Sequence, residues 1–201
     1  MCADSGLGWG GIPTCSALDG LSKVERTEQG HATGVTKLTF VSAFVLLEGM
    51  SINGLNAAAG GSTETVPWLD FLDVSTSIKS FLSSTNQIQD GNVMANDVYN
   101  MFYHDIDPTE AEKYISKLKP HSLATFADTT RSAAWRKIPS AYLICENDRS
   151  VPVPLQEMLI ETIRKEGGVI DTERLASGHS PYVKDPEFVA GFIERAATKA
   201  V

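Results

Sequence analysis

The last third of the chain alternates short apolar runs with amphipathic stretches, and this pattern constrains the fold more than any other feature. The runs AYLIC (141–145) and VIDTERL (169–175) have the length and residue content of strands. One helix is predicted to begin at Pro154 and another at Asp185–Pro186, each with its apolar residues on one face. The order strand, helix, strand, helix predicts a parallel α/β sheet.

The first part of the chain fits the same sheet. Residues 37–47, KLTFVSAFVLL, form an apolar run typical of a strand buried on both faces, and one helix is predicted from Ile12 to Glu28. The intervening sequence is helical and broken by loops, with a clear helix capped by Asp107. We therefore expect an α/β core made of residues 1–47 and 137–201, with a helical lid at 48–136.

Composition and charge exclude several function classes. The 201 residues are enough for one domain that needs no disulfide or metal for stability. The net charge of −8 without a basic cluster argues on electrostatic grounds against binding to nucleic acid. Cys2, Cys15 and Cys145 show no C-x-x-C spacing, so neither a zinc site nor a disulfide framework is expected. No apolar run or basic leader predicts a membrane span or signal peptide, so a cytoplasmic location is expected.

An acid and a histidine follow the two C-terminal strands. Asp148 comes after AYLIC and His179 after VIDTERL, and parallel strands end at the same edge of a sheet. A carboxylate that accepts from one imidazole nitrogen leaves the other nitrogen free to take a proton. Each residue also has a plainer interpretation: Asp148 could cap a turn, Glu146 could be the acid, and His179 could be a surface residue.

The chain resembles the α/β-hydrolase superfamily, in particular fungal relatives of the plant methylesterase and hydroxynitrile lyase group. The resemblance runs from about Gly10 to the C-terminus, through GGIPTCSALDGLSKVER, LTFVSAFVLLEG, NMFYHDID, AYLICENDRSVPVPLQEMLI and ASGHSPYVKDPEFVAGFI. It implies an α/β-hydrolase fold with Asp148 as the triad acid and His179 as the triad base. The order of acid before histidine agrees with that family.

The resemblance fails at the nucleophile. The sequence LGWGGIPT stands where the family has H-S-x-G-G-I-P-T, so Gly8 takes the serine's position and Leu7 that of the preceding histidine. Trp9 would then supply the backbone N–H of the oxyanion hole, while Gly10 and Gly11 are retained. The family has several strands before this turn, and we expect them to be missing here.

Other nucleophiles are weaker candidates. Ser5 lies three positions before Gly8 and would require the turn to be re-threaded. Cys2 is as loosely placed, Cys15 falls within the following helix, and Cys145 ends a buried strand, where inert packing is the more common role.

The same segment contains a G-x-G-x-x-G spacing at Gly6, Gly8 and Gly11. This dinucleotide fingerprint requires a strand directly before it, and MCADS is too short and polar to predict one. We therefore expect no cofactor and no metal.

The lid is expected to carry the substrate pocket. MFYHDID matches a lid motif of the family, which makes Tyr103 and His104 candidate substrate-binding residues. The aromatic residues of this region indicate an apolar ligand, although lids also bury aromatics for packing alone. They are Trp68, Phe71, Phe102, Tyr103, Phe126 and Trp135.

Three functions remain open. The first is a hydrolase of small, largely apolar esters or related metabolites, in fungal secondary metabolism. The second is a non-hydrolytic lyase, isomerase or cyclase in which Asp148 and His179 act as a general base. The third is a catalytically silent binding protein. A raw sheet edge beside the strand at 37–47 also predicts a homo-oligomer or a partner chain that covers it.

Overall fold

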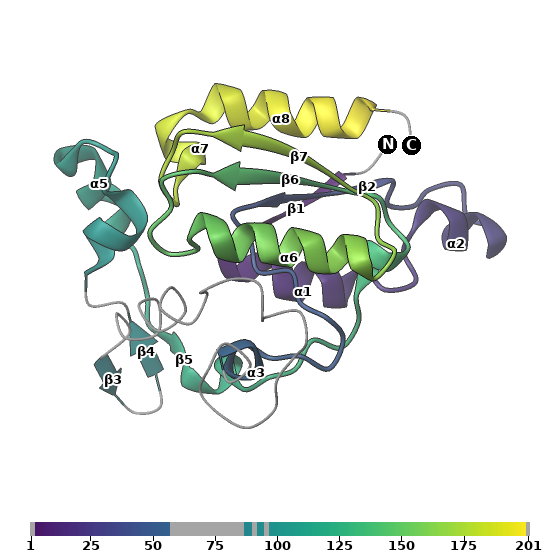
Figure 1. Cartoon of the computed structure of the whole chain (residues 1–201), viewed down its shortest axis with the longest axis horizontal. Coiled ribbons are helices and arrows are strands. Elements are labelled where there is room, and N and C mark those ends of the chain that lie inside the picture. Colours follow the sequence, from purple (N-terminus) through teal and green to yellow (C-terminus); the bar gives the residue numbers. More distant parts are fainter. Residues whose placement is uncertain (1–2, 57–86, 90–91, 95–96, 200–201) are drawn as a thin grey trace.

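The protein is described by a computed structural model that covers residues 3–56, 87–89, 92–94 and 97–199 (Figure 1). Four parallel strands form the main sheet in the order β1 (Ala3–Leu7), β2 (Lys37–Val41), β6 (Ser140–Cys145) and β7 (Ile170–Leu175). The predicted parallel α/β sheet is therefore confirmed. All four strands run the same way, so their carboxyl ends share one edge.

The sheet is covered on both faces, as its apolar strands predict (Figure 1). Helices α1 (Gly11–Ala17) and α6 (Val153–Lys165) lie on one face, and α8 (Pro186–Thr198) lies on the other. Side chains alternate along β6: Tyr142 belongs to the core on the α1 and α6 side, whereas Leu143 packs with Phe192 of α8. This period of two explains why the central strands are apolar throughout.

Two strand predictions at the N-terminus are wrong. Ala3–Leu7 is a strand in spite of its polar residues, because its backbone pairs with all five residues of β2. The run 37–47 is a strand only as far as Val41, and the chain turns at Ser42, which has a φ of 42°. The sheet edge in the described part of the chain is therefore β1 rather than the 37–47 strand.

The prediction of one long N-terminal helix is also wrong, because this segment forms two shorter helices. Helix α1 ends at Ala17, and α2 (Lys23–Glu28) begins after Ser22, whose side chain accepts from the Glu25 N–H. Val24 was expected on the buried face but is 65% exposed. The apolar spacing therefore did not mark one continuous face.

The described part of the segment 48–136 contains both helices and strands. Helices α3 (Ile52–Asn56) and α5 (Pro108–Ile115) accompany a small antiparallel sheet of β3 (Gln87–Gln89), β4 (Asn92–Met94) and β5 (His121–Ser122). The predicted cap is present: the Asp107 carboxylate accepts from the N–H groups of Thr109 and Glu110. The lid was predicted to be helical, and this sheet differs from that prediction. The predicted helical sequence at 62–82, with Trp68 and Phe71, lies outside the described residues.

The last helices follow the sequence closely. Helix α6 begins within one residue of the predicted Pro154, and α8 begins at Pro186 with the Asp185 side chain accepting from the Phe188 N–H. A short helix, α7 (Pro181–Lys184), precedes it and was not predicted. It directly follows the loop that carries His179.

Candidate active site

Asp148 lies in the loop after β6, with its side chain fully buried. Its Oδ1 accepts hydrogen bonds from the backbone N–H groups of Ser150, at 2.7 Å, and Val151, at 2.9 Å. Aspartate commonly closes a turn in this way. Two backbone donors therefore fix the plane of the carboxylate and leave Oδ2 facing away from the turn.

His179 lies in the loop after β7 and meets that oxygen. Its Nδ1 is 2.7 Å from Asp148 Oδ2, across 31 positions of sequence, and its side chain is 12% exposed. In a neutral imidazole that donates through Nδ1, Nε2 is the basic nitrogen. The predicted contact between the acid and the histidine is present, and Glu146 instead pairs with Arg174 at 2.9 Å.

Nε2 of His179 faces Gly8. This glycine follows β1 and has a φ of 50°, a left-handed conformation in which other residues are strained. A Cβ atom added to Gly8 would lie 3.1 Å from His179 Nε2. The chain therefore has the sharp strand–turn–helix of a nucleophile elbow, with its apex aimed at the base and no side chain on it.

Glycine is required nearby for a different reason. The position of a Cβ on Gly11 lies 2.3 Å from the carbonyl oxygen of Phe44, and one on Gly6 lies 2.8 Å from the Cα of Gly11. Strand β1, helix α1 and the segment after β2 thus approach as closely as backbone allows. A strand does precede the G-x-G-x-x-G spacing, contrary to the prediction. The contacts above explain Gly6 and Gly11 by close packing of the backbone.

Trp9 is the residue after Gly8. Its ring is half-buried and makes edge contacts with Phe126, at 4.8 Å between centroids, and with Phe44, at 6.4 Å. The side chain thus packs into an apolar cluster, and only the backbone N–H of Trp9 would serve an oxyanion. That role remains a prediction.

The segment Tyr99–Tyr103, a π-helical turn, places an aromatic side chain against the base. The ring of Phe102 lies 5.3 Å from the imidazole of His179 between centroids. Tyr103 instead stacks on Tyr114 and is buried, and burial raises the pKa of its phenol. The sequence indicated Tyr103 as the substrate-binding candidate, whereas the structure places Phe102 against the base.

His104 and Asp105 lie beside the loop that carries His179. Asp105 Oδ2 accepts from the N–H of Gly178 at 2.7 Å, and Lys184 Nζ donates to the Asp105 carbonyl at 2.6 Å. His104 Cε1 lies 2.8 Å from where a Cβ of Gly178 would be. Asp105 was not predicted, and only its place in the family-like stretch NMFYHDID could have drawn attention to it.

The aromatic residues at the end of the lid region belong to the cores of the protein. Trp135 is 1% exposed and lies in the main core, where its Nε1 donates to the Leu46 carbonyl. Phe126 is 3% exposed and packs in a second cluster with Leu155 of α6. For these two residues the packing interpretation applies, and they do not add pocket surface.

None of the alternative nucleophiles within the described residues lies at the apex of the elbow. Ser5 is in the middle of β1, three residues before Gly8, which amounts to roughly 10 Å along a strand. Burial raises the pKa of both Cys15 and Cys145 to about 12, so each is a thiol at neutral pH. Cys2 lies outside the described residues.

Ser42 is a site residue that the sequence did not reveal. It is fully buried at the end of β2, and its Oγ donates to Asp148 Oδ2. The one signal in the sequence was a serine followed and preceded by apolar residues within the run 37–47.

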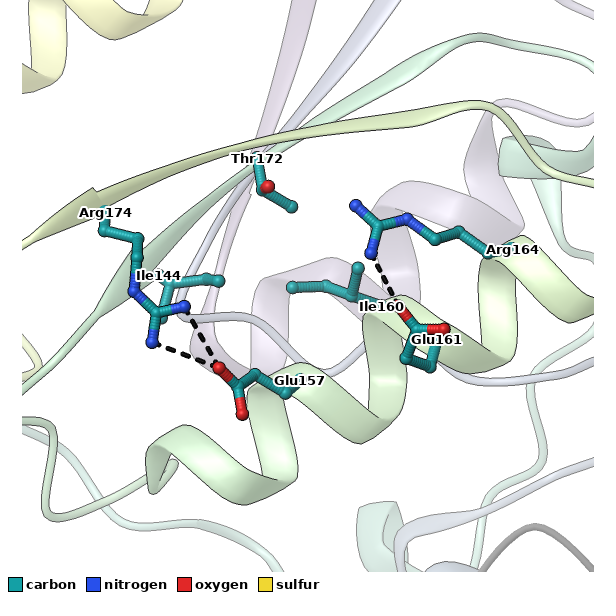
Figure 2. A pocket seen from close by; sticks show the side chains of 7 residues that line it. All are labelled: Ile144, Glu157, Ile160, Glu161, Arg164, Thr172 and Arg174. Atoms are coloured by element: carbon teal, nitrogen blue, oxygen red, sulfur yellow. Dashed lines mark hydrogen bonds and ion pairs between the residues drawn. The ribbon is translucent and has the colours of Figure 1, made fainter.

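A surface hollow of about 300 Å³ lies elsewhere, between α6 and β7 (Figure 2). Its charged side chains are matched in ion pairs, Arg174 with Glu157 and Arg164 with Glu161. Arg174 also pairs with Glu146. This balance leaves no excess charge that would attract an ion.

The described residues contain no group of three or more histidine, cysteine, aspartate or glutamate side chains placed to hold a metal ion. Within the same residues, no helix has both the length and the apolar content needed to cross a bilayer.

The comparisons with known proteins agree with this geometry. A family model described as the alpha/beta hydrolase family matches residues 6–192. The chain belongs to the α/β-hydrolase family. The matched range includes the elbow, the acid and the histidine, so the family assignment covers the whole candidate site.

Two fungal proteins are similar in sequence. "Alpha/beta hydrolase nvfD" of Aspergillus novofumigatus is 34% identical over 107 residues, covering 53% of this chain and 42% of that protein. "Probable hydrolase R7" of a Phoma species is 24% identical over 190 residues, covering 94% of this chain and 67% of that protein. The chain thus spans less than half of the first relative and about two thirds of the second.

Solved structures share the α/β-hydrolase fold. A pyrethroid hydrolase from Sphingobium faniae matches with a TM-score of 0.64 and 16% identity, covering 98% of this chain and 70% of that one. Polyneuridine aldehyde esterase matches with 0.65 and 14%, covering 97% and 71%. A methylesterase from Arabidopsis matches with 0.58 and 16%, covering 98% and 69%. The resemblance to the plant methylesterase group is therefore confirmed at the level of the fold.

Proposed function

We propose that this α/β-hydrolase acts on a small, largely apolar metabolite, with Asp148 and His179 as a general base and no covalent nucleophile from the chain. The observation that carries the proposal is the position of Gly8. Its missing side chain would point at His179 Nε2, with the Cβ at 3.1 Å. The base is thus oriented, but the group that it would activate in a serine hydrolase is absent.

The reaction that follows is proton abstraction from a bound substrate. The Nδ1–H of His179 donates to Asp148, so the lone pair of Nε2 is available on the Gly8 side. Nε2 takes a proton from a substrate C–H or O–H, and the electron pair stays on the substrate as an enolate or alkoxide. Asp148 stabilises the imidazolium that forms, and a base of this kind contributes roughly 10²–10⁴-fold.

The surroundings of the base support an apolar substrate. Phe102 packs against the imidazole of His179, and the half-buried ring of Trp9 follows Gly8 directly. Trp9 is also proposed to supply a backbone N–H to the oxyanion that develops on the substrate. Elimination, isomerisation and cyclisation of an apolar metabolite can each use this combination of one base and one anion-stabilising donor. The two sequence relatives are fungal, and we extend the proposal to a role in fungal secondary metabolism.

Ester hydrolysis by an activated water is the second candidate. The two fungal relatives carry hydrolase names, and a pyrethroid hydrolase and two esterases are among the structural neighbours. In this version Nε2 takes a proton from water as the water attacks the ester carbonyl, and the imidazolium returns that proton to the alcohol that leaves when the C–O bond breaks. No acyl-enzyme forms in either candidate.

The test is a reaction panel on the purified chain in deuterated and ¹⁸O-labelled water. Deuterium incorporation at acidic C–H positions of apolar keto esters supports proton abstraction, and ¹⁸O in a released acid supports hydrolysis. Both signals should fall by at least about 10²-fold in His179→Ala. Serine labelling by a fluorophosphonate probe that Ser5→Ala abolishes would contradict the proposal. Binding of panel compounds without turnover, unchanged in His179→Ala, would instead indicate a silent binding protein.

A further inference from the structure

Ser42 occupies a backbone conformation that serine rarely adopts. Its φ is 42°, in the left-handed region, and its side chain is fully buried. Hydrogen bonds on both sides hold the backbone there. The Ser42 N–H donates to the Leu143 carbonyl at 3.0 Å, and the Tyr142 hydroxyl donates to the Ala43 carbonyl at 2.8 Å. A glycine would tolerate this conformation better, so packing of the backbone alone does not account for a serine.

The hydroxyl explains the residue type. Ser42 Oγ donates to Asp148 Oδ2, which is the oxygen that also accepts from His179 Nδ1. The other oxygen, Oδ1, is occupied by the N–H groups of Ser150 and Val151. The orientation of the carboxylate is thus already fixed by the backbone. What Ser42 changes is the charge on the one oxygen that faces the base.

We propose that Ser42 is a positioning residue that shares the charge of Asp148 Oδ2 and thereby weakens the hydrogen bond between His179 and Asp148. The role rests on the proposed function of the pair as a general base. Two donors on one carboxylate oxygen divide its negative charge, so each hydrogen bond is weaker than it would be alone. His179 then meets a partly compensated carboxylate.

The backbone around Ser42 also connects the acid to the elbow. Two residues after Ser42, the N–H of Phe44 donates to the Gly8 carbonyl at 2.8 Å. The turn at Ser42 therefore faces Asp148 through its side chain and holds Gly8 through the segment that follows. This explains why the strand stops at Val41 while the apolar sequence continues.

The test is proton NMR of the Nδ1–H of His179, assigned with ¹⁵N-labelled histidine and its loss in His179→Gln. This signal reports the hydrogen bond to Asp148 without any substrate. We expect the resonance to move downfield in both Ser42→Ala and Ser42→Gly, because the competing donor is gone. Ser42→Gly also removes the backbone strain, so it keeps the test valid if Ser42→Ala does not fold.

Ser150→Ala is the matched control. It removes a buried serine hydroxyl from the loop that carries Asp148 but keeps the backbone N–H that donates to Asp148. The Nδ1–H resonance of His179 should therefore not move in this variant. An unchanged or lost resonance in folded Ser42→Gly would overturn the role of Ser42 alone. Absence of the resonance from the parent chain would overturn the pair itself, and the proposed function with it.

Discussion

Gly8→Ser should convert this site into a working serine triad. The backbone at Gly8 already has the φ of 50° of an elbow, and the new Cβ would lie 3.1 Å from His179 Nε2 and 3.3 Å from Cε1. These contacts are tight, so the imidazole must move by a few tenths of an ångström. Because Oγ extends from that Cβ, it comes within hydrogen-bond reach of Nε2.

The cost of this change to stability is small. A non-glycine residue in the left-handed region costs about 1–2 kcal/mol, and replacing glycine returns about 0.4–1 kcal/mol by restricting the unfolded chain. The net loss is about 1 kcal/mol, which lowers Tm by roughly 2–4 °C in a chain of this size. The variant should therefore fold and can be assayed directly.

The assay is covalent labelling by a fluorophosphonate probe, with hydrolysis of p-nitrophenyl acetate as the rate measurement. Loss of the triad serine in a serine protease costs about 10⁶-fold in kcat, and we expect a newly installed serine to recover at least about 10²-fold. Gly8→Ala carries the same backbone strain without a hydroxyl and should remain unlabelled. Labelling should also disappear when His179→Gln is added to Gly8→Ser.

The result that would refute this reasoning is a Gly8→Ser protein that melts like Gly8→Ala and is not labelled. Such a protein would have the serine in place and the fold intact, yet no activated nucleophile. The position of His179 Nε2 next to residue 8 would then not be sufficient to activate a nucleophile there.

Three further predictions concern the fold. Gly11→Ala should destabilise the protein by about 1–3 kcal/mol in urea unfolding, in spite of alanine's helix propensity, because the new Cβ would lie 2.3 Å from the Phe44 carbonyl oxygen. Gly10→Ala is the control: its Cβ would meet nothing within 4 Å, so its effect on stability should be close to neutral or stabilising. A side-chain hydrogen bond from Lys199 lowers the pKa of Asp171 in the folded protein below its usual 3.8. The stability that Asp171 adds is therefore fully present above pH 3.8 and is lost as the pH falls through the lower pKa of the folded state. Asp171→Asn should flatten this part of a Tm-against-pH curve. Strand β1 is the edge of the main sheet among the described residues, which predicts self-association; light scattering would show it as a dimer mass, and a monomer at micromolar concentration would contradict it.

The acid and the histidine could be predicted because their positions depend on local patterns. Asp148 and His179 each follow a recognisable strand, and the strands β6 and β7 are neighbours in the sheet. The rule that parallel strands end at one edge then brings the two loops together. No long-range detail was needed.

The other site residues depend on contacts that no local pattern encodes. Ser42 acts through a turn that interrupts an apolar run, and the run itself predicts a strand that continues. Asp105 meets Gly178 across 73 positions, and nothing in the spacing of the two residues predicts that contact. Strand β1 was missed for a similar reason, since pairing with β2 outweighs the weak strand preference of its own residues.

The hydrogen bond between Asp105 and Gly178 joins two segments that lie 73 positions apart in the chain. The residue next to Gly178 is the base itself, so any displacement of the segment around Asp105 pulls on the backbone that orients the imidazole. Lys184, the last residue of α7, adds a second tether to the same segment. A shift of the segment around Asp105 would therefore also change the orientation of the imidazole that we propose as the base.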